Sequence, residues 1–406
     1  MVPSHRVNAH AGRFDPRSHD LVHDPYPVFA ELRAAGRPVW NDDLGMWLAA
    51  RYRDADAVVR HRGLGRIYQP RLPEELWAGF NKLERDSILG CEPPKHTRLR
   101  GLLGKAFARG NIERLRPHIR ELCQVLLDGI EARARDGQPF DLIAEYAEPL
   151  PVMVIAELLG IPDSDRHLLR PWSADLVKMN EYERSPAQEA AARVAAAEFS
   201  AYVHALAAER LRRPDDDLIT HLVQAEQEGD RLAEDELVAT VVVLLNAGHE
   251  ASVNCLGNGM VALLSHPEQQ RRLARQPAEL AATAAEEFLR FDSPLHLFER
   301  TAMADVEIGG VVVRAGERIA ALLGSANRDP EVFERADEFD VGREPNPHVA
   351  FGGGVHFCVG APLARVELET ALRSLLERYP TLSLAGTPVR RPTFVQRGWS
   401  CIPVTV

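Results

Sequence analysis

The sequence predicts one mainly helical domain with a minor β portion, spanning residues 1–406. Segments rich in Ala, Leu, Arg and Glu repeat apolar residues with a period near 3.6, whereas strand-like pieces are few and short. No Gly/Ser linker, low-complexity tract, fixed-period repeat or composition shift divides the chain. We therefore expect a single large unit and not a string of small domains.

The elements follow one another in a simple order. Residues 39–40 and 46–49 are strand-like and flank a turn. Helical periodicity then runs through residues 96–134, 186–213, 233–265 and 267–290. Residues 306–308 and 311–313 flank Gly309-Gly310, which predicts a β-hairpin. A glycine-rich loop finally leads into a last helix, with Pro362 in its first turn.

The segment 233–265 is the most unusual element. Its acidic start suits a helix N-terminus, and its apolar run predicts a helix that crosses the centre of the molecule. Residues 246–252 interrupt the run with an amide, a glycine and the acid Glu250, whose burial is costly without partners. Either this is a packing notch with Glu250 turned to solvent, or the helix meets a ligand there. Gly257 and Gly259 match a dinucleotide fingerprint, but within a helix they are expected to admit a close helix contact.

Composition and charge exclude several functions. The chain has 48 Lys+Arg against 59 Asp+Glu and a net charge of −11, which argues against a dedicated nucleic-acid binder. Residues 1–20 have no apolar core, and no run approaches the roughly 20 apolar residues of a membrane span, so we expect a cytoplasmic protein. The five cysteines are odd in number and lack C-x-x-C spacing, which indicates neither disulfides nor a zinc site.

Cys358 differs from the other four cysteines, which are expected to be small buried residues. It follows a glycine-rich loop and directly precedes a helix, a position at which we expect a lowered thiol pKa. The glycines let the backbone approach something large and flat and leave N–H groups to face the sulfur. A structural buried cysteine needs none of this.

The segment 351–360 matches the haem-binding signature F-G-x-G-x-H-x-C-x-G, and the whole chain resembles the soluble, single-domain bacterial members of the cytochrome P-450 superfamily. The resemblance implies haem b between the long central helix and the cysteine-loop helix, with Cys358 as its axial thiolate. It also implies that Phe351 packs beside this cysteine. Gly360 would let the following helix lie close to the porphyrin.

Other family motifs follow in register. Glu287 and Arg290 match the E-x-x-R motif, and the resemblance implies that Arg343 joins them in a buried triad that braces the loop under the haem. Residues 93–100 resemble the P-P-x-H-x-R-x-R stretch. Haem propionates are carboxylates that need cationic partners when buried. The resemblance assigns four residues to that role: His96, Arg100, Arg300 and His356.

Residues 247–251 resemble the A-G-x-[DE]-[TS] motif, whose acid and alcohol help to route protons to dioxygen. Glu250 keeps the acid, but Ala251 replaces the alcohol. Three hypotheses follow. Ser252 substitutes for the alcohol, although it lies about 100° further round the helix; a substrate hydroxyl with ordered water completes the relay; or proton delivery is poor, and the enzyme leaks peroxide or needs no relay. We favour the second.

The substrate pocket is placed by the same resemblance. Its wall should include segments 63–90 and 172–182 and the centre of the long helix. Six residues are expected to touch substrate: Val243, Asn246, Ala247, Leu295, His296 and Phe394. Asn246 is unusual in such a wall. It either fixes a polar group of the substrate or bonds a neighbouring backbone carbonyl.

The resemblance implies a monomeric haem-thiolate monooxygenase that uses O2 to hydroxylate or epoxidise a small, largely apolar organic molecule, such as a natural-product intermediate. Electrons would come from NAD(P)H through a ferredoxin reductase and a ferredoxin. A basic cluster could attract an acidic ferredoxin; its members are Arg98, Lys105, Arg109 and Arg114. The alternatives are a haem-thiolate protein that binds a ligand or gas without turnover, and peroxide-driven oxidation on the same fold.

Overall fold

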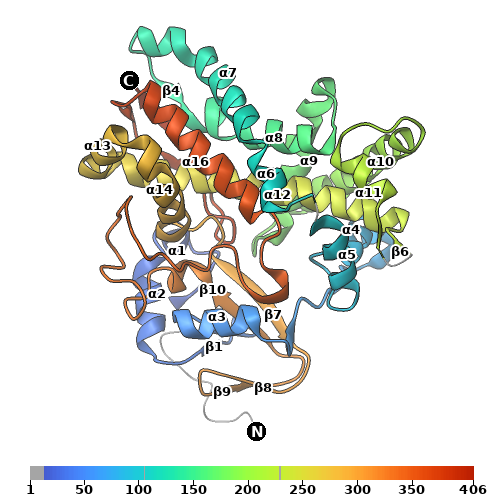
Figure 1. Ribbon diagram of the computed structural model, residues 1–406. Helices are drawn as coiled ribbons and strands as arrows, with labels where there is room; N and C mark the ends of the chain where they lie inside the picture. Colours follow the sequence, from blue (N-terminus) through green and yellow to red (C-terminus); the bar gives the residue numbers. More distant parts are fainter. Residues whose placement is uncertain (1–12, 105, 228–229) are drawn as a thin grey trace.

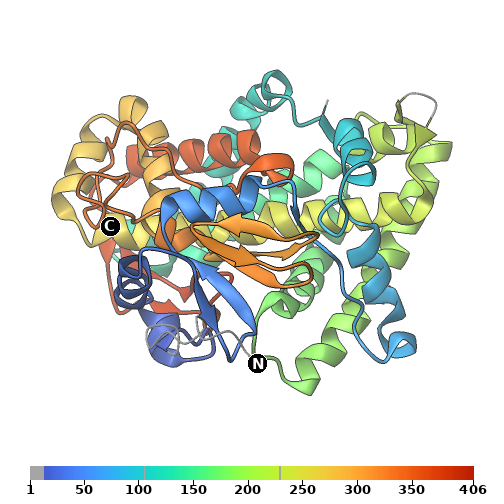
Figure 2. The same ribbon diagram turned by 90° about the horizontal axis from the view of Figure 1, so that it is seen from below.

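The computed structural model describes residues 13–104, 106–227 and 230–406. Most helices gather at one end of the molecule, while the largest sheet lies at the other end with helices α1 to α3 (Figure 1). Seen from below, the sheet lies in front of the long helix α12, which runs across the molecule behind it (Figure 2). The predicted class, mainly helical with a minor β portion, is confirmed.

The helices have the following bounds: α1 (His19–His23), α2 (Tyr26–Ala34), α3 (Tyr52–Arg60), α4 (Glu74–Asp86), α5 (Lys95–Gly104), α6 (Arg109–Glu113), α7 (Arg116–Arg135), α8 (Pro149–Leu159), α9 (Arg166–Val177), α10 (Pro186–Arg212), α11 (Leu218–Gln224), α12 (Glu234–Leu264), α13 (Pro267–Arg275), α14 (Pro277–Phe291), α15 (Leu323–Ala326) and α16 (Ala361–Arg378). Two of the predicted helices are divided. The segment 96–134 contains α5, α6 and α7, and 267–290 breaks at Gln276 because a residue before proline is disfavoured in the helical region.

The strands form small sheets. Their bounds are β1 (Val39–Asn41), β2 (Met46–Ala49), β3 (Leu64–Gly65), β4 (Phe140–Asp141), β5 (Glu226–Gln227), β6 (Asp230–Arg231), β7 (Leu297–Ala302), β8 (Val306–Ile308), β9 (Val311–Val313), β10 (Arg318–Leu322), β11 (Ser383–Leu384), β12 (Val389–Arg390), β13 (Trp399–Cys401) and β14 (Pro403–Thr405). The largest sheet has the order β1-β2-β10-β7-β3. The predicted hairpin is present as β8–β9, with left-handed φ at both Gly309 and Gly310.

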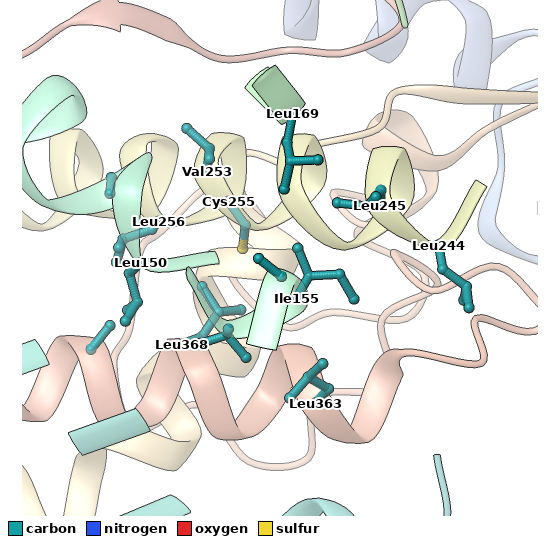
Figure 3. Packing of buried hydrophobic residues seen from close by; sticks show 14 of the residues in the cluster. Leu150, Ile155, Leu169, Leu244, Leu245, Val253, Cys255, Leu256, Leu363 and Leu368 are labelled. Carbon is teal, nitrogen blue, oxygen red and sulfur yellow. The ribbon is translucent and has the colours of Figure 1, made fainter. Parts of the chain in front are cut away.

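Helix α12 runs through the centre of the main hydrophobic core. It packs on α8, α4, α14 and α16, and side chains from these helices interlock, with Ile155 of α8 between α12 and α16 (Figure 3). By length and composition alone α12 could span a membrane, contrary to expectation, but 67% of that window is buried inside the protein. The expected close helix contact is confirmed, because a Cβ on Gly259 would lie 1.8 Å from Cδ2 of Phe288 on α14.

Candidate active site

The loop before α16 presents Cys358 on a tightly folded turn. Gly352 and Gly354 have φ of +68° and +63°, a conformation that side chains other than glycine rarely adopt. The Cys358 N–H donates to the carbonyl of Phe351 at 3.0 Å, which closes the turn. A Cβ on Gly354 would lie 2.7 Å from the carbonyl oxygen of Val59 on α3. The glycines therefore let the loop pack directly against the α3 backbone.

The environment of the Cys358 sulfur acts on its pKa in two directions. Burial raises the thiol pKa, while backbone N–H groups of Gly360 and Ala361 and the positive charges of Arg100 and Arg365 oppose that rise. The thiol pKa is raised overall, so the prediction of a lowered pKa is wrong. The backbone N–H groups at the helix N-terminus do lower the pKa as expected, but the effect of desolvation is larger. A Cβ on Gly360 would meet only the Cys358 sulfur, at 3.9 Å, so that side of the loop is open.

The triad expected beneath the loop is present. Glu287 and Arg290, both fully buried, form two hydrogen bonds at 2.7 and 2.8 Å, and Arg343 Nε lies 3.1 Å from Glu287 Oε2. The two guanidinium groups also donate to five backbone carbonyls, from residues 327, 334, 335, 336 and 338. Because every charge in the triad has partners, it fixes the segment that leads to the cysteine loop.

A second ion pair holds the loop and was missed by the sequence analysis. Arg365 on α16 makes a bidentate contact with Glu286 at 2.7 and 3.0 Å, and its guanidinium lies 4.6 Å from the centre of the Phe351 ring. His348 also bonds Glu286, at 3.0 Å. These partners lower the pKa of Glu286 to about 2 against the opposing effect of burial. No spacing rule links Glu286 to Arg365, since the two lie on different helices.

Arginine and histidine side chains converge on one side of the same loop. The ring centres of His96 and His356 are 4.4 Å apart, and His356 bonds Glu92 at 2.8 Å. Burial, with repulsion from Arg66, lowers the pKa of Arg300 to about 9. Burial also lowers the pKa of His96 to about 4, so this ring is neutral near pH 7.

Arg66, which follows β3, was not singled out from the sequence. It lies close enough to Arg300, His96 and His356 to affect the pKa of each. Among the described residues, none of Arg66, Arg100 and Arg300 has a carboxylate ion-pair partner, although Glu84, Glu92 and Glu299 lie near enough to act on the pKa of Arg66. Three guanidinium groups without a direct ion pair can each bind a further carboxylate, which suits the two propionates of haem.

Helix α12 has one open face in an otherwise buried span. From Glu236 to Met260 the helix is buried except at positions 243, 246, 247, 248 and 251, and Ala247 is exposed. Val243, Ala247 and Ala251 are four residues apart and so form a stripe along one side. Asn246 borders it, and its buried Oδ1 has no hydrogen-bond partner among the described residues. Gly248 faces elsewhere, since a Cβ there would meet Ile155 at 3.2 Å.

The acid and the hydroxyl beside this stripe point to different partners. Glu250, 4% exposed, pairs with Arg391 Nη1 at 2.8 Å, so it is neither turned to solvent nor without a partner. Burial raises the pKa of the Glu367 carboxyl on α16 to about 8, and the Ser252 hydroxyl lies close enough to that carboxyl to oppose the rise. Ser252 is therefore turned toward α16, which argues against its replacing the missing alcohol at Ala251.

Two of the six expected substrate contacts are core residues instead. His296 and Phe394 are 0% and 1% exposed, and their rings, 5.5 Å apart, pack with Phe29. The expectation that they touch substrate is wrong, because β7 begins at the next residue and turns His296 toward the N-terminal helices. Leu295 is half-buried and pairs with Gln396 in a β-bridge.

The segments expected to wall the pocket do meet. Arg71 donates to the carbonyl of Met179 at 2.9 Å. Glu181 accepts three backbone N–H bonds, from residues 394, 395 and 396, at 2.9–3.0 Å. The Tyr182 hydroxyl donates to Glu299 on β7. The segment between α9 and α10 is therefore tied to three other parts of the chain.

A surface hollow of about 470 Å³ lies where α6, α7, α14 and α16 meet. Arginine and glutamate line it in equal number: Arg109, Arg116, Arg365, Glu113, Glu286 and Glu369. The basic cluster expected here is only partly formed. Arg98 instead pairs with Glu236 in the first turn of α12, and Arg114 bonds Asn111. Lys105 lies outside the described residues.

Comparison with known proteins decides the family. The profile described as Cytochrome P450 matches residues 175–277 and 275–396. The chain is 36% identical over 394 residues to the "Biotin biosynthesis cytochrome P450" of Bacillus subtilis (strain 168), covering 96% of this chain and 98% of that one. The chain belongs to the cytochrome P450 family. Another relative, "Nocardicin C N-oxygenase" of Nocardia uniformis subsp. tsuyamanensis, is 42% identical and covers 91% and 92% of the two chains.

The fold of this cytochrome P450 agrees with solved structures. P450BioI, crystallised "in complex with hexadec-9Z-enoic acid ligated Acyl Carrier Protein", superposes with a TM-score of 0.90 at 34% identity, over 96% of this chain and 100% of that one. The protein is a cytochrome P450 monooxygenase, and its cofactor is haem with a cysteine thiolate ligand. The residues fit this group, since the cysteine loop has an open side, guanidinium groups without a direct ion pair adjoin it, and the buried His356 Nδ1 has no partner among the described residues.

Proposed function

We propose that this cytochrome P450 hydroxylates or epoxidises a small, largely apolar natural-product-like molecule carrying at least one hydrogen-bond donor. The stripe on α12 carries the proposal. Val243, Ala247 and Ala251 offer an apolar wall, while Asn246 Oδ1 is a buried acceptor with no partner among the described residues. Relatives whose names include "Vitamin D(3) 25-hydroxylase" and "Mycinamicin IV hydroxylase/epoxidase" support this class.

Cys358 is proposed as the haem ligand, with Phe351 and Gly360 beside it. Haem held by a thiolate supplies the activation of dioxygen, because the thiolate donates electron density to the iron. His96, Arg100, Arg300 and His356 would bind the propionates. Arg66 would join these four, since it belongs to the same buried cationic group.

Glu250 is proposed to deliver protons, and Ala251 leaves room beside it for a substrate hydroxyl and water. The side chain of Ser252 lies toward Glu367 on α16, which supports substrate assistance over replacement of the alcohol by Ser252. Product formed per NAD(P)H consumed should be compared in wild type and Ala251→Thr with substrate bound. A similar yield supports substrate assistance, whereas a large gain in the variant would count against it.

Electrons are proposed to come from NAD(P)H through a ferredoxin reductase and a ferredoxin, which would dock near the surface hollow where α6, α7, α14 and α16 meet. Arg109 would contact the ferredoxin there, since Arg116 and Arg365 are paired with glutamates of the hollow. We place the protein in the cytoplasm as a monomer. None of its five cysteines forms a disulfide in the structure, which agrees with a reducing compartment.

The proposal is tested by titrating the purified protein against a metabolite library and recording the spin-state shift of the haem. Compounds that cause the shift are then assayed for product and NAD(P)H consumption with surrogate redox partners. A shift without product would favour the ligand- or gas-binding alternative. Equal product from peroxide without redox partners would favour peroxide-driven oxidation.

A further inference from the structure

A carboxylate on the inner face of α4 has no direct partner in the described part of the chain. Glu84 follows Trp77 and Phe80 at helical spacing, so it lies on the same face as these two rings, which are buried in the main core. Among the described residues, the Glu84 carboxylate forms no hydrogen bond and no ion pair. A charge withdrawn from water is costly unless it is paired, so this carboxylate lacks a counter-charge.

The space in front of Glu84 lies inside the protein. The side chain is half-buried, yet desolvation raises the pKa of its carboxyl above the usual value for a glutamate. A carboxylate with the same exposure at the outer surface would be hydrated by bulk water and would keep its ordinary pKa. Glu84 therefore borders an internal space and not the outer surface.

The chain around Glu84 fixes the backbone that carries the carboxylate. The Ser87 hydroxyl donates to the Glu84 carbonyl at 2.9 Å, and Ser87 Oγ accepts the N–H groups of Leu89 and Gly90 at 3.2 and 3.1 Å. A Cβ on Gly90 would lie 1.9 Å from the Glu84 carbonyl oxygen, so the chain folds back tightly onto this residue.

Two arginines act on Glu84 from a distance, but each has another role. Arg71 donates to the carbonyl of Met179 at 2.9 Å, and its guanidinium lies 5.4 and 5.3 Å from the ring centres of Trp77 and Phe80. Arg66 belongs to the group that the proposed function assigns to the haem propionates. Both arginines oppose the rise in the pKa of Glu84, but the effect of desolvation is larger.

Glu84 lies within reach of the stripe on α12. Helix α4 packs on α12 and on α10 (Figure 1). Lys82, two residues before Glu84, pairs with Asp235 in the first turn of α12 at 2.6 Å. Val243, the first residue of the stripe, follows about 12 Å further along that helix. A molecule of that length can therefore extend from Glu84 to the stripe.

We propose that Glu84 determines substrate choice by binding a cationic amine, so that the substrate class is a largely apolar molecule with a basic nitrogen. This inference rests on the proposed function and deepens it, since it adds an anchor on α4 to the acceptor of Asn246 on α12. A cation supplies the counter-charge that the carboxylate lacks, and the attraction is strong in a site withdrawn from water. Binding at α4 leaves the apolar end of the molecule for the stripe.

Three probes with the same chain length and different charge test this on the holoenzyme. They are dodecyltrimethylammonium, dodecanol and dodecanoate, and the quaternary nitrogen has no lone pair with which to coordinate iron. Dissociation constants are measured by the spin-state shift and by calorimetry. Wild type should bind the cation at least about tenfold more tightly than the alcohol. Equal affinity for these two probes, or tightest binding of dodecanoate, would overturn the proposal.

Variants on α4 assign the effect to one carboxylate. Glu84→Gln should bind the cation about tenfold more weakly and dodecanol as well as the wild type does, and Glu84→Asp should recover part of the loss. Glu75→Gln is the matched control, because it removes the same charge from the exposed surface of the same helix. It should leave all three affinities unchanged. A cation preference that survives in Glu84→Gln, or that Glu75→Gln reduces equally, would contradict the assignment.

Thermal unfolding distinguishes ligand binding from a structural role of this residue. Because the Glu84 carboxylate has no direct partner among the described residues, Glu84→Gln should melt no lower than Glu75→Gln and should keep its haem content. A midpoint several degrees lower in Glu84→Gln alone would show that the carboxylate is paired within the protein, and the proposal would fail.

Product formation with surrogate redox partners separates this inference from the proposed function. If dodecanol or an uncharged library compound yields product while the cation gains nothing from Glu84, only this inference fails. If library compounds with a basic nitrogen bind through Glu84 but no library compound is oxidised, the proposed monooxygenase function fails, and the role of Glu84 in substrate choice fails with it.

Discussion

Replacing Glu287 by Gln tests the brace under the cysteine loop. The carboxylate is fully buried and accepts from Arg290, Arg343, the backbone N–H of Asp340 and the amide of Asn346. A glutamine would keep one acceptor oxygen but turn an NH2 group toward donors, and it would leave two buried guanidinium groups without a counter-charge. Breaking a buried ion pair on one side costs about 3–5 kcal/mol.

For a chain of 406 residues, that loss corresponds to a fall of about 4–6 °C in the thermal midpoint. The midpoint should be followed by far-UV circular dichroism, and haem content should be measured on the same samples. Glu279→Gln is the matched control, an exposed glutamate on the same helix α14. A variant Glu287→Gln that melts with the control and retains its haem would refute the view that these charges brace the loop.

Three further predictions concern the haem, the pH dependence and the helix packing. Cys358→Ser should lose the thiolate-type Soret band of the reduced carbon monoxide complex, and Cys401→Ser, at another half-buried thiol, should keep it; a band retained in Cys358→Ser would disprove the ligand assignment. The pKa of Glu367 is about 8 in the folded protein and 4.5 in the unfolded chain, so the folded state binds more protons between these two values. The free energy of unfolding of the wild type should therefore fall by up to about 5 kcal/mol as the pH rises from 4.5 to 8. Glu367→Gln should flatten that loss in urea titrations at about pH 5 and about pH 8, and an unchanged slope would contradict the assignment. Gly259→Ala should lower the free energy of unfolding by about 1–3 kcal/mol, since its Cβ would lie 1.8 Å from the Phe288 ring; a neutral effect in the same titration would show that α14 can move away.

Arg66 offers a test of the guanidinium groups that lack a direct ion pair beside the cysteine loop. Arg66→Gln removes one of the three guanidinium groups near the cysteine loop, so the purified protein should contain several-fold less haem per chain. The pyridine haemochromogen assay measures this directly. Arg212→Gln is a suitable control, because Arg212 is exposed and, among the described residues, bonds only the backbone carbonyl of Ala208. Equal haem content in the two variants would exclude Arg66 from cofactor binding.

Local sequence determined the features that depend on neighbours along the chain. The cysteine turn followed from its glycines, since left-handed φ at Gly352 and Gly354 is a property of single residues. Glu287 and Arg290 were paired correctly because residues three apart share a helix face. The sequence also located the break in the apolar run of α12 at residues 246–252, but it left open whether the helix meets a ligand there or forms a packing notch.

Only the tertiary structure decided the contacts between distant segments. Arg391 reaches Glu250 across 141 positions, and Arg365 reaches Glu286 across 79, so no pattern in either segment names the partner. The directions of Ser252 and His296 were also invisible in the sequence, because a side chain's direction depends on how its element packs against the others. Spacing along one element fixes which residues share a face, but packing alone fixes what that face meets.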